Sequence, residues 1–416
     1  MSAVPTTTAT PAPDGRSAVG AGQLLQVLRD GVPRTRADLV AETGLARSTV
    51  TLRLDALLRT GLLRSETGTS TGGRPPIFVR FDPRARTVLA IDLGAAHLAV
   101  AVTDLDGTVL AEHREDLDIT LGPGPVLDIA TRRGQELLAE VGGTSPLAGV
   151  GIGLPGPVEQ ATGRPRTPPI MPGWDGADVV GMLGRHFGVP VLVDNDVDLM
   201  ALGEHITSYP TTAHLMFVKI ATGVGAGIVA DHRLVRGADG AAGDLGHVAV
   251  PGGAPVQCAC GNTGCLEALT SGTAILRSVR ALGHDARRLE EVQALLDDPG
   301  VAEVVRLAGQ NLGAVLAGCV NLLNPSVIVI GGPLAHEPSP LFEGIEQMVR
   351  GRSLPLATSK LQVVASRTEG RAGLLGGARV VIDRVLDPRT VDAMGSTEAH
   401  ASAGARYRPP SPIDDE

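Results

Sequence analysis

Apolar residues near the start of the chain recur at helical spacing and predict a small three-helix domain over residues 19–82. The first helix begins near Gln23, and the next two are predicted over residues 36–43 and 47–60. The third helix keeps its apolar positions on one stripe, as a helix with a single buried face does: Val50, Leu54, Leu57 and Leu58.

Short polar residues and glycines mark the ends of these helices. Thr35 is a predicted N-cap, Asp38 suits the first turn that follows it, and Gly44 can end that helix. Gly61 ends the third helix in the same way. The run over residues 62–81 then predicts two short strands around a Gly-rich loop.

After residue 83 the pattern changes to strands that alternate with helices. The predicted strands are residues 87–91, 97–103, 147–152, 190–193, 215–220, 226–230 and 327–330. The predicted helices are residues 126–141, 179–187, 197–204 and 302–323. This alternation indicates an α/β domain whose mixed sheet is covered on both faces.

Length and composition add the domain boundaries. A chain of 416 residues is too long for one compact core, so we expect more than one domain. Residues 1–18 and 388–416 are polar and rich in Pro, Ala or Thr, and we expect both tails to be disordered. The three-helix head would then occupy residues 19–82, and a larger body residues 87–387.

The composition also excludes some classes of protein. Aromatic residues make up only 2% of the chain, which disfavours single-stranded nucleic acid as a partner. No apolar run reaches the roughly 20 residues of a membrane span, and the first residues do not resemble a secretory signal. Only four cysteines are present, so a disulfide framework is not expected and the cytoplasm is the predicted location.

Charge is unevenly divided along the chain. The overall net charge is −9, yet residues 1–80 contain ten Arg, no Lys and six acidic residues. A basic head on an acidic body suggests that only the head meets a polyanion. An uneven but merely solvated surface would give the same totals.

The head has the spacing of a winged helix-turn-helix. Gly44 allows a tight turn between two helices whose apolar positions fix their angle. The second of these helices would present polar side chains to a DNA major groove: Arg47, Ser48, Thr49, Thr51 and Arg53. In the wing, Arg74 precedes two prolines and could enter a minor groove. The alternative is an ordinary three-helix cap with an exposed polar face.

One cysteine cluster predicts a metal site. His247, Cys258, Cys260 and Cys265 supply one imidazole and three thiolates, which complete a tetrahedral shell for structural Zn²⁺. Three unrelated buried thiols are the alternative. Cys319 stands alone in an apolar segment and is predicted to pack in the core.

Six motifs occur in an order that resembles the ROK family (repressors, open reading frames and kinases), over about residues 87–385. They are Asp92-Leu-Gly94, Gly153-Leu-Pro155-Gly156, Asp194-Asn195-Asp196, Thr222-Gly223-Val-Gly225-Ala-Gly227, Gly243-Asp244-Leu-Gly246-His247 and Cys258-x-Cys260-x4-Cys265-Leu-Glu267. The preceding helix-turn-helix is similar to the regulator branch, whose members resemble xylose and N-acetylglucosamine repressors. The resemblance implies an actin-like (ribonuclease H-like) fold of two α/β lobes, with sugar in the cleft and, in the kinases, nucleotide beside it.

The resemblance also implies roles for single residues. The implied sugar-binding positions are Asn195, Asp196, Asp244, His247 and Glu267. The implied nucleotide positions, vestigial in a regulator, are Asp92, Gly94, Thr222, Gly223, Gly225, Gly331 and Gly332. Asp196 would be the catalytic general base if the protein were a kinase, whereas as a purely structural residue it would cap the helix that follows.

Departures from the kinase pattern favour a regulator. Gly94 leads into Ala95-Ala96-His97, where kinases have a Thr and then a Lys or similar residue. Lost phosphate contacts should weaken ATP use more than sugar binding, so we expect no ATP requirement. Asp244 stands where a Glu is usual, one methylene shorter.

The sequence therefore predicts a sugar-responsive transcriptional repressor of carbohydrate-metabolism genes. Its partners would be double-stranded operator DNA, a sugar or sugar-phosphate effector and further copies of the chain, as a homodimer or homotetramer, with no membrane. The alternative is an ATP-dependent hexose kinase of the ROK family that also binds DNA. A pure protein-interaction module would leave the sugar-binding motifs unexplained.

Overall fold

The computed structural model describes residues 20–69, 75–143 and 145–395. It divides into two compact units. One contains the chain up to Ala85 together with the residues from Arg384 onward, and the other is Arg86–Asp383. The predicted tail at residues 1–18, the wing residue Arg74 and residues 396–416 lie outside the described residues.

The first unit has the predicted three helices and a small sheet. Its elements are α1 (Ala21–Leu28), β1 (Arg34–Thr35), α2 (Arg36–Thr43), α3 (Arg47–Thr60), β2 (Leu63–Thr67) and β3 (Ile77–Phe81), followed by the short 3-10 turn η1 (Pro83–Ala85). The strands form an antiparallel sheet in the order β1-β3-β2, of which the sequence predicted only β2 and β3. On α3, Val50, Leu54 and Leu57 are buried as predicted, whereas Leu58 is only half-buried.

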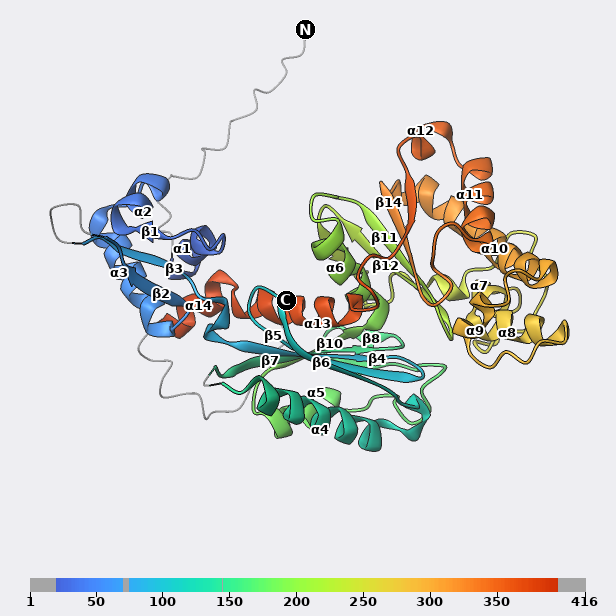
Figure 1. Ribbon diagram of the computed structural model, residues 1–416, viewed down its shortest axis with the longest axis horizontal. Coiled ribbons are helices and arrows are strands. Elements are labelled where there is room, and N and C mark those ends of the chain that lie inside the picture. The colour runs from blue at the N-terminus through green and yellow to red at the C-terminus, as the bar shows by residue number, and fades with distance from the viewer. Residues whose placement is uncertain (1–19, 70–74, 144, 396–416) are drawn as a thin grey trace, which may run out of the picture. The chain divides into compact units, whose positions relative to one another are not determined.

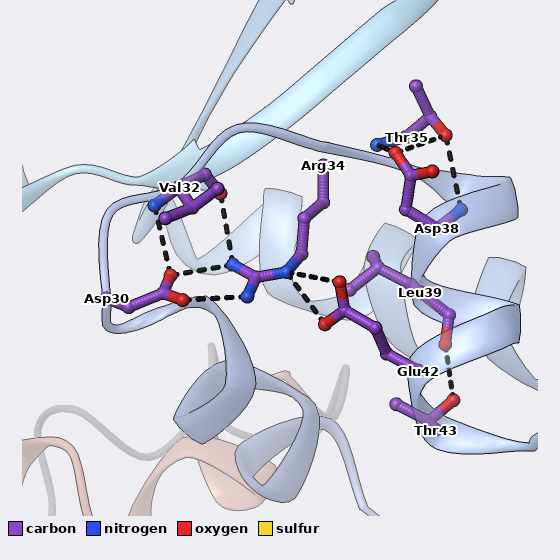
Figure 2. A network of polar contacts seen from close by, with 8 residues as sticks. All are labelled: Asp30, Val32, Arg34, Thr35, Asp38, Leu39, Glu42 and Thr43. Carbon is purple, nitrogen blue, oxygen red and sulfur yellow. Dashed lines mark hydrogen bonds and ion pairs between the residues drawn. The ribbon is translucent and has the colours of Figure 1, made fainter.

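Polar contacts fix both ends of α2. Thr35 caps the helix, accepting from the Asp38 N–H at 3.2 Å, and the Asp38 carboxylate accepts from the Thr35 N–H at 2.8 Å. Arg34 donates to both Asp30 and Glu42, which ties the loop before β1 to α2 (Figure 2). Gly44 ends α2 at a φ of 68°, a left-handed conformation that favours glycine.

The tail prediction from residue 388 onward is wrong for its first residues. Helix α14 (Pro388–Gly395) packs against α1 and α3 of the first unit. Val391 is fully buried there, and the Gly22 N–H donates to Oδ1 of Asp392 at 2.8 Å. The segment is too short and too polar to form a helix alone, so its order comes from this packing.

The second unit consists of two lobes with the same sheet topology. The first sheet has the order β6-β5-β4-β7-β10 and the second β13-β12-β11-β14-β15. In both, the first three strands pair antiparallel and the last three pair parallel. The repeated arrangement confirms the predicted two-lobed α/β fold.

The strands lie close to their predicted positions. They are β4 (Thr87–Leu93), β5 (His97–Thr103), β6 (Val109–Asp116), β7 (Leu147–Leu154), β10 (Val191–Asn195), β11 (Leu215–Ile220), β12 (Val224–Ala230), β13 (Arg233–Val235), β14 (Val327–Gly331) and β15 (Gln362–Ala365), with a separate pair β8 (Val158–Glu159) and β9 (Arg164–Pro165). The sequence did not predict the edge strands β6, β13 and β15 or the pair β8 and β9, because these strands are short or carry many polar residues.

Helices cover both sheets. They are α4 (Pro123–Val141), α5 (Val179–Phe187), α6 (Asp196–Ser208), α7 (Leu266–Thr270), α8 (Gly272–Ala281), α9 (Leu289–Gln293), α10 (Pro299–Leu323), α11 (Pro340–Arg352), α12 (Pro355–Thr358) and α13 (Ala372–Val385), with 3-10 turns η2 (Ile119–Leu121) and η3 (Leu245–His247). Figure 1 shows α4 and α5 on one face of the first sheet and α13 on the other. Among the described helices, none has both the length and the hydropathy needed to cross a membrane.

Helices α6 and α13 meet where the two lobes join. A Cβ on Gly376 would lie 1.9 Å from the carbonyl oxygen of Leu199, so only glycine permits this close approach of the two backbones. Further along, a Cβ on Gly203 would lie 2.0 Å from the Ala372 carbonyl oxygen, so the first turn of α13 lies beside the middle of α6.

Candidate functional site

A cleft of about 1460 Å³ is lined by residues of both lobes of the second unit. All five residues to which the sequence assigned sugar binding lie along it: Asn195, Asp196, Asp244, His247 and Glu267. They come from the end of β10, the start of α6, the turn η3 and α7. The fold thus brings together residues that are up to 72 positions apart in the sequence.

Asn195, rather than Asp196, caps helix α6. The Asn195 side-chain oxygen accepts from the N–H groups of Val197 and Asp198, at 2.9 and 3.2 Å. Its amide nitrogen donates to the Gly156 carbonyl at 3.0 Å. Asn195 therefore takes the N-cap role that was the structural alternative for Asp196, although Asp196 also accepts from the Val197 N–H.

Asp196 forms an ion pair that the sequence did not predict. The ammonium of Lys219 on β11 lies 2.6 Å from Oδ2 of Asp196, and the other carboxylate oxygen accepts from the Val197 N–H at 2.9 Å. Burial raises the pKa of Asp196, and the Lys219 charge offsets part of that rise. Burial also disfavours the Lys219 ammonium, but the charges of Asp196 and Asp92 outweigh it and raise the pKa of this lysine.

Asp92 also lines the cleft, near the end of β4. Its Oδ2 lies 3.5 Å from Nε2 of His97, and its Oδ1 accepts no hydrogen bond from the described residues. Burial would raise the pKa of Asp92, but His97 and the charges of Lys219 and Arg114 hold it below its usual range. Together with Ala95 and Ala96, His97 lines the cleft where the kinase pattern has other residues.

The remaining nucleotide-type positions are mostly at the same cleft. The lining includes Thr222, Gly223, Gly225, Gly331 and Gly332, whereas Gly94 is not part of it. Close packing requires glycine at one of these positions, Gly332, and at Gly227 within strand β12. Gly332 has a φ of 118°, and a Cβ there would lie 1.9 Å from the Ile220 carbonyl oxygen. A Cβ on Gly227 would lie 2.5 Å from that of Ala201 on α6.

Two further acidic residues flank Asn195 and Asp196: Asp194 in β10 and Asp198 in α6. Asp194 is held by Arg236, at 2.7 and 2.8 Å, and by the amide of Gln160. Asp198 is buried with no hydrogen bond to its Oδ1 from the described residues. Burial, and then the neighbouring Asp194, raise the pKa of Asp198 to about 8. Sequence reasoning missed both environments because the partners come from distant strands and loops.

The predicted metal ligands form one cluster. The ligand atoms of His247, Cys258, Cys260 and Cys265 all lie within 4.8 Å of one another. Nδ1 of His247 is 3.7 Å from Sγ of Cys258, and the Sγ atoms of Cys260 and Cys265 are also 3.7 Å apart. Ligands about 2.0–2.3 Å from a tetrahedral ion have such separations, so these four donors fit a structural metal site. Cys319 lies apart on α10, against the core of the second lobe.

In the first unit, the predicted recognition side chains differ in exposure. Arg47 and Ser48, at the start of α3, are exposed. Thr49, Thr51 and Arg53 are half-buried, and Nε of Arg53 is buried without a hydrogen-bond partner among the described residues. Arg36 on α2 pairs with Asp55 on α3 at 2.9 Å, which helps to fix the two helices. The first turn of α3 is therefore the accessible part of the predicted interface.

Comparison with known proteins defines the class to which this fold and cleft belong. Residues 88–384 match the ROK family model, and the chain belongs to the ROK family. It is 28% identical to the xylose repressor of Bacillus spizizenii, over 88% of this chain and 95% of the repressor. It is 30% identical to the glucokinase of Thermotoga maritima, over 72% of this chain and 98% of the kinase.

A solved structure matches both units of the chain. It is a ROK family transcriptional regulator described as a homologue of the E. coli MLC protein. The match has a TM-score of 0.75 and 28% identity, and it covers 91% of this chain and 98% of the regulator. The repressor-type relatives thus extend over the first unit, whereas the glucokinase covers less of the chain.

Proposed function

We propose that this protein is a sugar-responsive, DNA-binding transcriptional repressor of carbohydrate-metabolism genes. The observation that carries the proposal is the joining, in one chain, of a helix-turn-helix unit to a ROK unit whose cleft gathers all five sugar-type residues. The likeness of nearly the whole chain to a xylose repressor supports it. Double-stranded operator DNA and a sugar or sugar-phosphate effector are the corresponding partners.

The cleft offers sugar hydroxyls both carboxylates and an imidazole. Asp196, Asp244 and Glu267 would accept hydrogen bonds, and Asn195 has a second amide proton to donate. A sugar can change DNA affinity only if it binds one arrangement of the lobes more tightly than another. In a dimer, lobe closure would alter the spacing of two helix-turn-helix heads, and half-sites lie about one helical turn apart.

Zinc is the metal that the cluster fits best. Three thiolates and one imidazole form a closed tetrahedral shell, and such sites stabilise the loops that carry them. We propose that the ion orders residues 247–265. It would hold His247 through Nδ1 and leave the other ring nitrogen for a sugar hydroxyl.

A thermal-shift screen of sugars and sugar phosphates tests the proposal. We expect at least one to raise the melting temperature, as any ligand that prefers the native state does, and we expect Glu267→Gln to reduce the shift. A gel-shift with the upstream DNA of the gene should then show binding that this ligand changes. A protein that responds to no sugar and binds no upstream DNA would contradict the proposal.

The second candidate function is an ATP-dependent hexose kinase. It is favoured by the position of Asp196 in the cleft and by the glucokinase relative. Incubation with Mg-ATP and a panel of hexoses separates the two functions. We expect no sugar phosphate above the background of an Asp196→Asn control, and turnover that this substitution abolishes would favour the kinase.

A further inference from the structure

The ion pair of Lys219 and Asp196 is nearly closed to solvent. Their side chains are 15% and 4% exposed, and the nitrogen–oxygen distance is 2.6 Å. Lys219 comes from β11 of the second lobe, and Asp196 begins α6. Taking two charges out of water is costly, so a pair in this position needs close geometry and further neighbours to be stable.

The charge of a second buried carboxylate acts on the same cation. Asp92 is 2% exposed and comes from β4 of the other lobe, and its charge acts on Lys219 as well as on Asp196. Its Oδ1 accepts no hydrogen bond from the described residues, and its His97 neighbour lies at 3.5 Å on a side chain that is 40% exposed. Lys219 is therefore the most buried positive charge near these two acids.

These contacts bear on what Asp196 can do. A general base must take a proton, and the Lys219 ammonium beside one oxygen of Asp196 disfavours the protonated carboxyl. Each oxygen accepts only one hydrogen bond from the described residues, so Asp196 can still accept another from a sugar hydroxyl. Phosphoryl transfer also needs divalent cations beside the phosphates. A lysine that already neutralises the cleft carboxylates disfavours a second cation there, because like charges repel.

We propose that Lys219 is the built-in counter-cation of the cleft: it replaces a divalent metal beside Asp92 and Asp196 and keeps Asp196 a hydrogen-bond acceptor for sugar rather than a base. This inference rests on the proposed function. It gives a reason, from a residue of the second lobe, why the cleft would bind sugar without phosphorylating it. The cleft would then combine the departure from the kinase pattern at Ala95-Ala96 with a carboxylate that is already paired with a lysine.

The test removes the Lys219 ammonium and measures whether the remaining carboxylates then bind an added divalent cation. The variants are Lys219→Met, Lys219→Met with Asp196→Asn, and the control Lys360→Met, which removes the one other lysine, an exposed one. Thermal unfolding is followed with millimolar MgCl₂ and with NaCl at equal ionic strength. We expect Lys219→Met to melt at least about 5 °C below the control in NaCl and to regain part of the loss in MgCl₂ only.

Two measurements distinguish the counter-cation role of Lys219 from simple packing of its aliphatic chain: the stability of the double variant, and the pH dependence of the stability of Lys219→Met. Asp196 is faced by Asp92 from β4, His97 from β5 and Lys219 from β11, with Asp198 on its own helix. Without Lys219 the buried carboxylate binds a proton more tightly, so the loss of stability should be small near about pH 5 and grow towards about pH 8. Asp196→Asn in the same chain should restore stability and abolish the Mg²⁺ response.

Several results would overturn the inference. They are a Lys219→Met protein as stable as the control at the higher pH, a loss of stability independent of pH, or no response to Mg²⁺. If Lys219→Met does not fold, recovery in the double variant supports the inference and continued failure to fold contradicts it. No sugar or DNA enters these measurements, so their result is separate from the test of the proposed function.

Discussion

The backbone N–H of Gly22 donates a 2.8 Å hydrogen bond to Oδ1 of Asp392, which connects the first helix of the chain to α14. The Gln26 amide makes a second such contact, with the Leu386 carbonyl at 2.8 Å. Helix α14 also packs on α3, the proposed recognition helix. The first unit, the proposed helix-turn-helix domain, is thus completed by residues that directly follow the ROK fold in sequence.

We therefore expect Val391→Asp to destabilise the first unit. Val391 is fully buried, and an unpaired carboxylate there should cost about 3 kcal/mol or more of unfolding free energy. Chemical denaturation, together with operator affinity, measures the effect. Arg389→Asp places the same group on an exposed position of α14 and should change stability little. Equal effects of the two substitutions would refute a supporting role for this helix.

Asp198 should make the free energy of unfolding fall as pH rises, which is opposite to the effect of a salt-bridged carboxylate whose pKa is lowered. Its pKa is raised to about 8 in the folded protein, well above the unfolded value near 3.8. The folded state therefore holds the proton more tightly, and this contribution to stability is full below about pH 4 and is lost as pH rises towards about 8.

Asp198→Asn should remove that dependence. The amide carries no charge at any pH, so the variant should gain about 1–3 kcal/mol over the parent above pH 8 and much less at low pH. Denaturant titrations across this pH range measure the difference. An unchanged pH profile would show that Asp198 does not titrate as its burial implies.

Much of the fold could be predicted from the sequence because its signals are local. Buried strands such as β4, β11 and β14 are short apolar runs between turns, and Thr35 with Asp38 specifies the start of α2. The metal cluster could also be predicted from the sequence, because three of its four ligands lie within eight residues. Helix α14 was missed because its order depends on contact with residues more than 360 positions earlier.

Only part of the candidate site could be predicted from the sequence, because its other contacts join residues that are distant in the chain. The motifs placed Asn195 and Asp196 in the cleft, but the sequence did not indicate that Asn195 caps α6 or that a lysine from β11 would reach Asp196. The available signal was Lys219, the one charged residue in an otherwise apolar strand. A lysine buried in such a strand needs an acidic partner, but the sequence does not show which residue that is.

Substitution of Arg47 should lower DNA affinity alone, whereas substitution of Arg53 should lower both DNA affinity and stability. Arg47 is exposed at the first turn of α3, so Arg47→Ala should weaken operator binding by about 1–3 kcal/mol without loss of stability. Arg53 is half-buried, and its substitution should lower both affinity and stability. Fluorescence anisotropy with thermal unfolding separates these effects. Undiminished binding by Arg47→Ala would remove it from the interface.

Cys260→Ser should lose the metal. It removes one of four ligands, so we expect zinc content to fall from about one ion per chain and the melting temperature to fall with it. Cys319→Ser is the matched control, because this cysteine lies outside the cluster on α10, and it should keep its zinc. Elemental analysis of the purified variants gives the answer. Full zinc occupancy in Cys260→Ser would contradict the assignment.

The most direct test of the central claim is the affinity of the protein for its upstream DNA, measured by anisotropy with and without the sugar that most raises its melting temperature. A repressor that senses sugar should change its DNA dissociation constant by roughly fivefold or more when the sugar saturates the cleft. Glu267→Gln should shift this response to higher sugar concentration. An unchanged dissociation constant at saturating sugar, with DNA binding intact, would contradict the account.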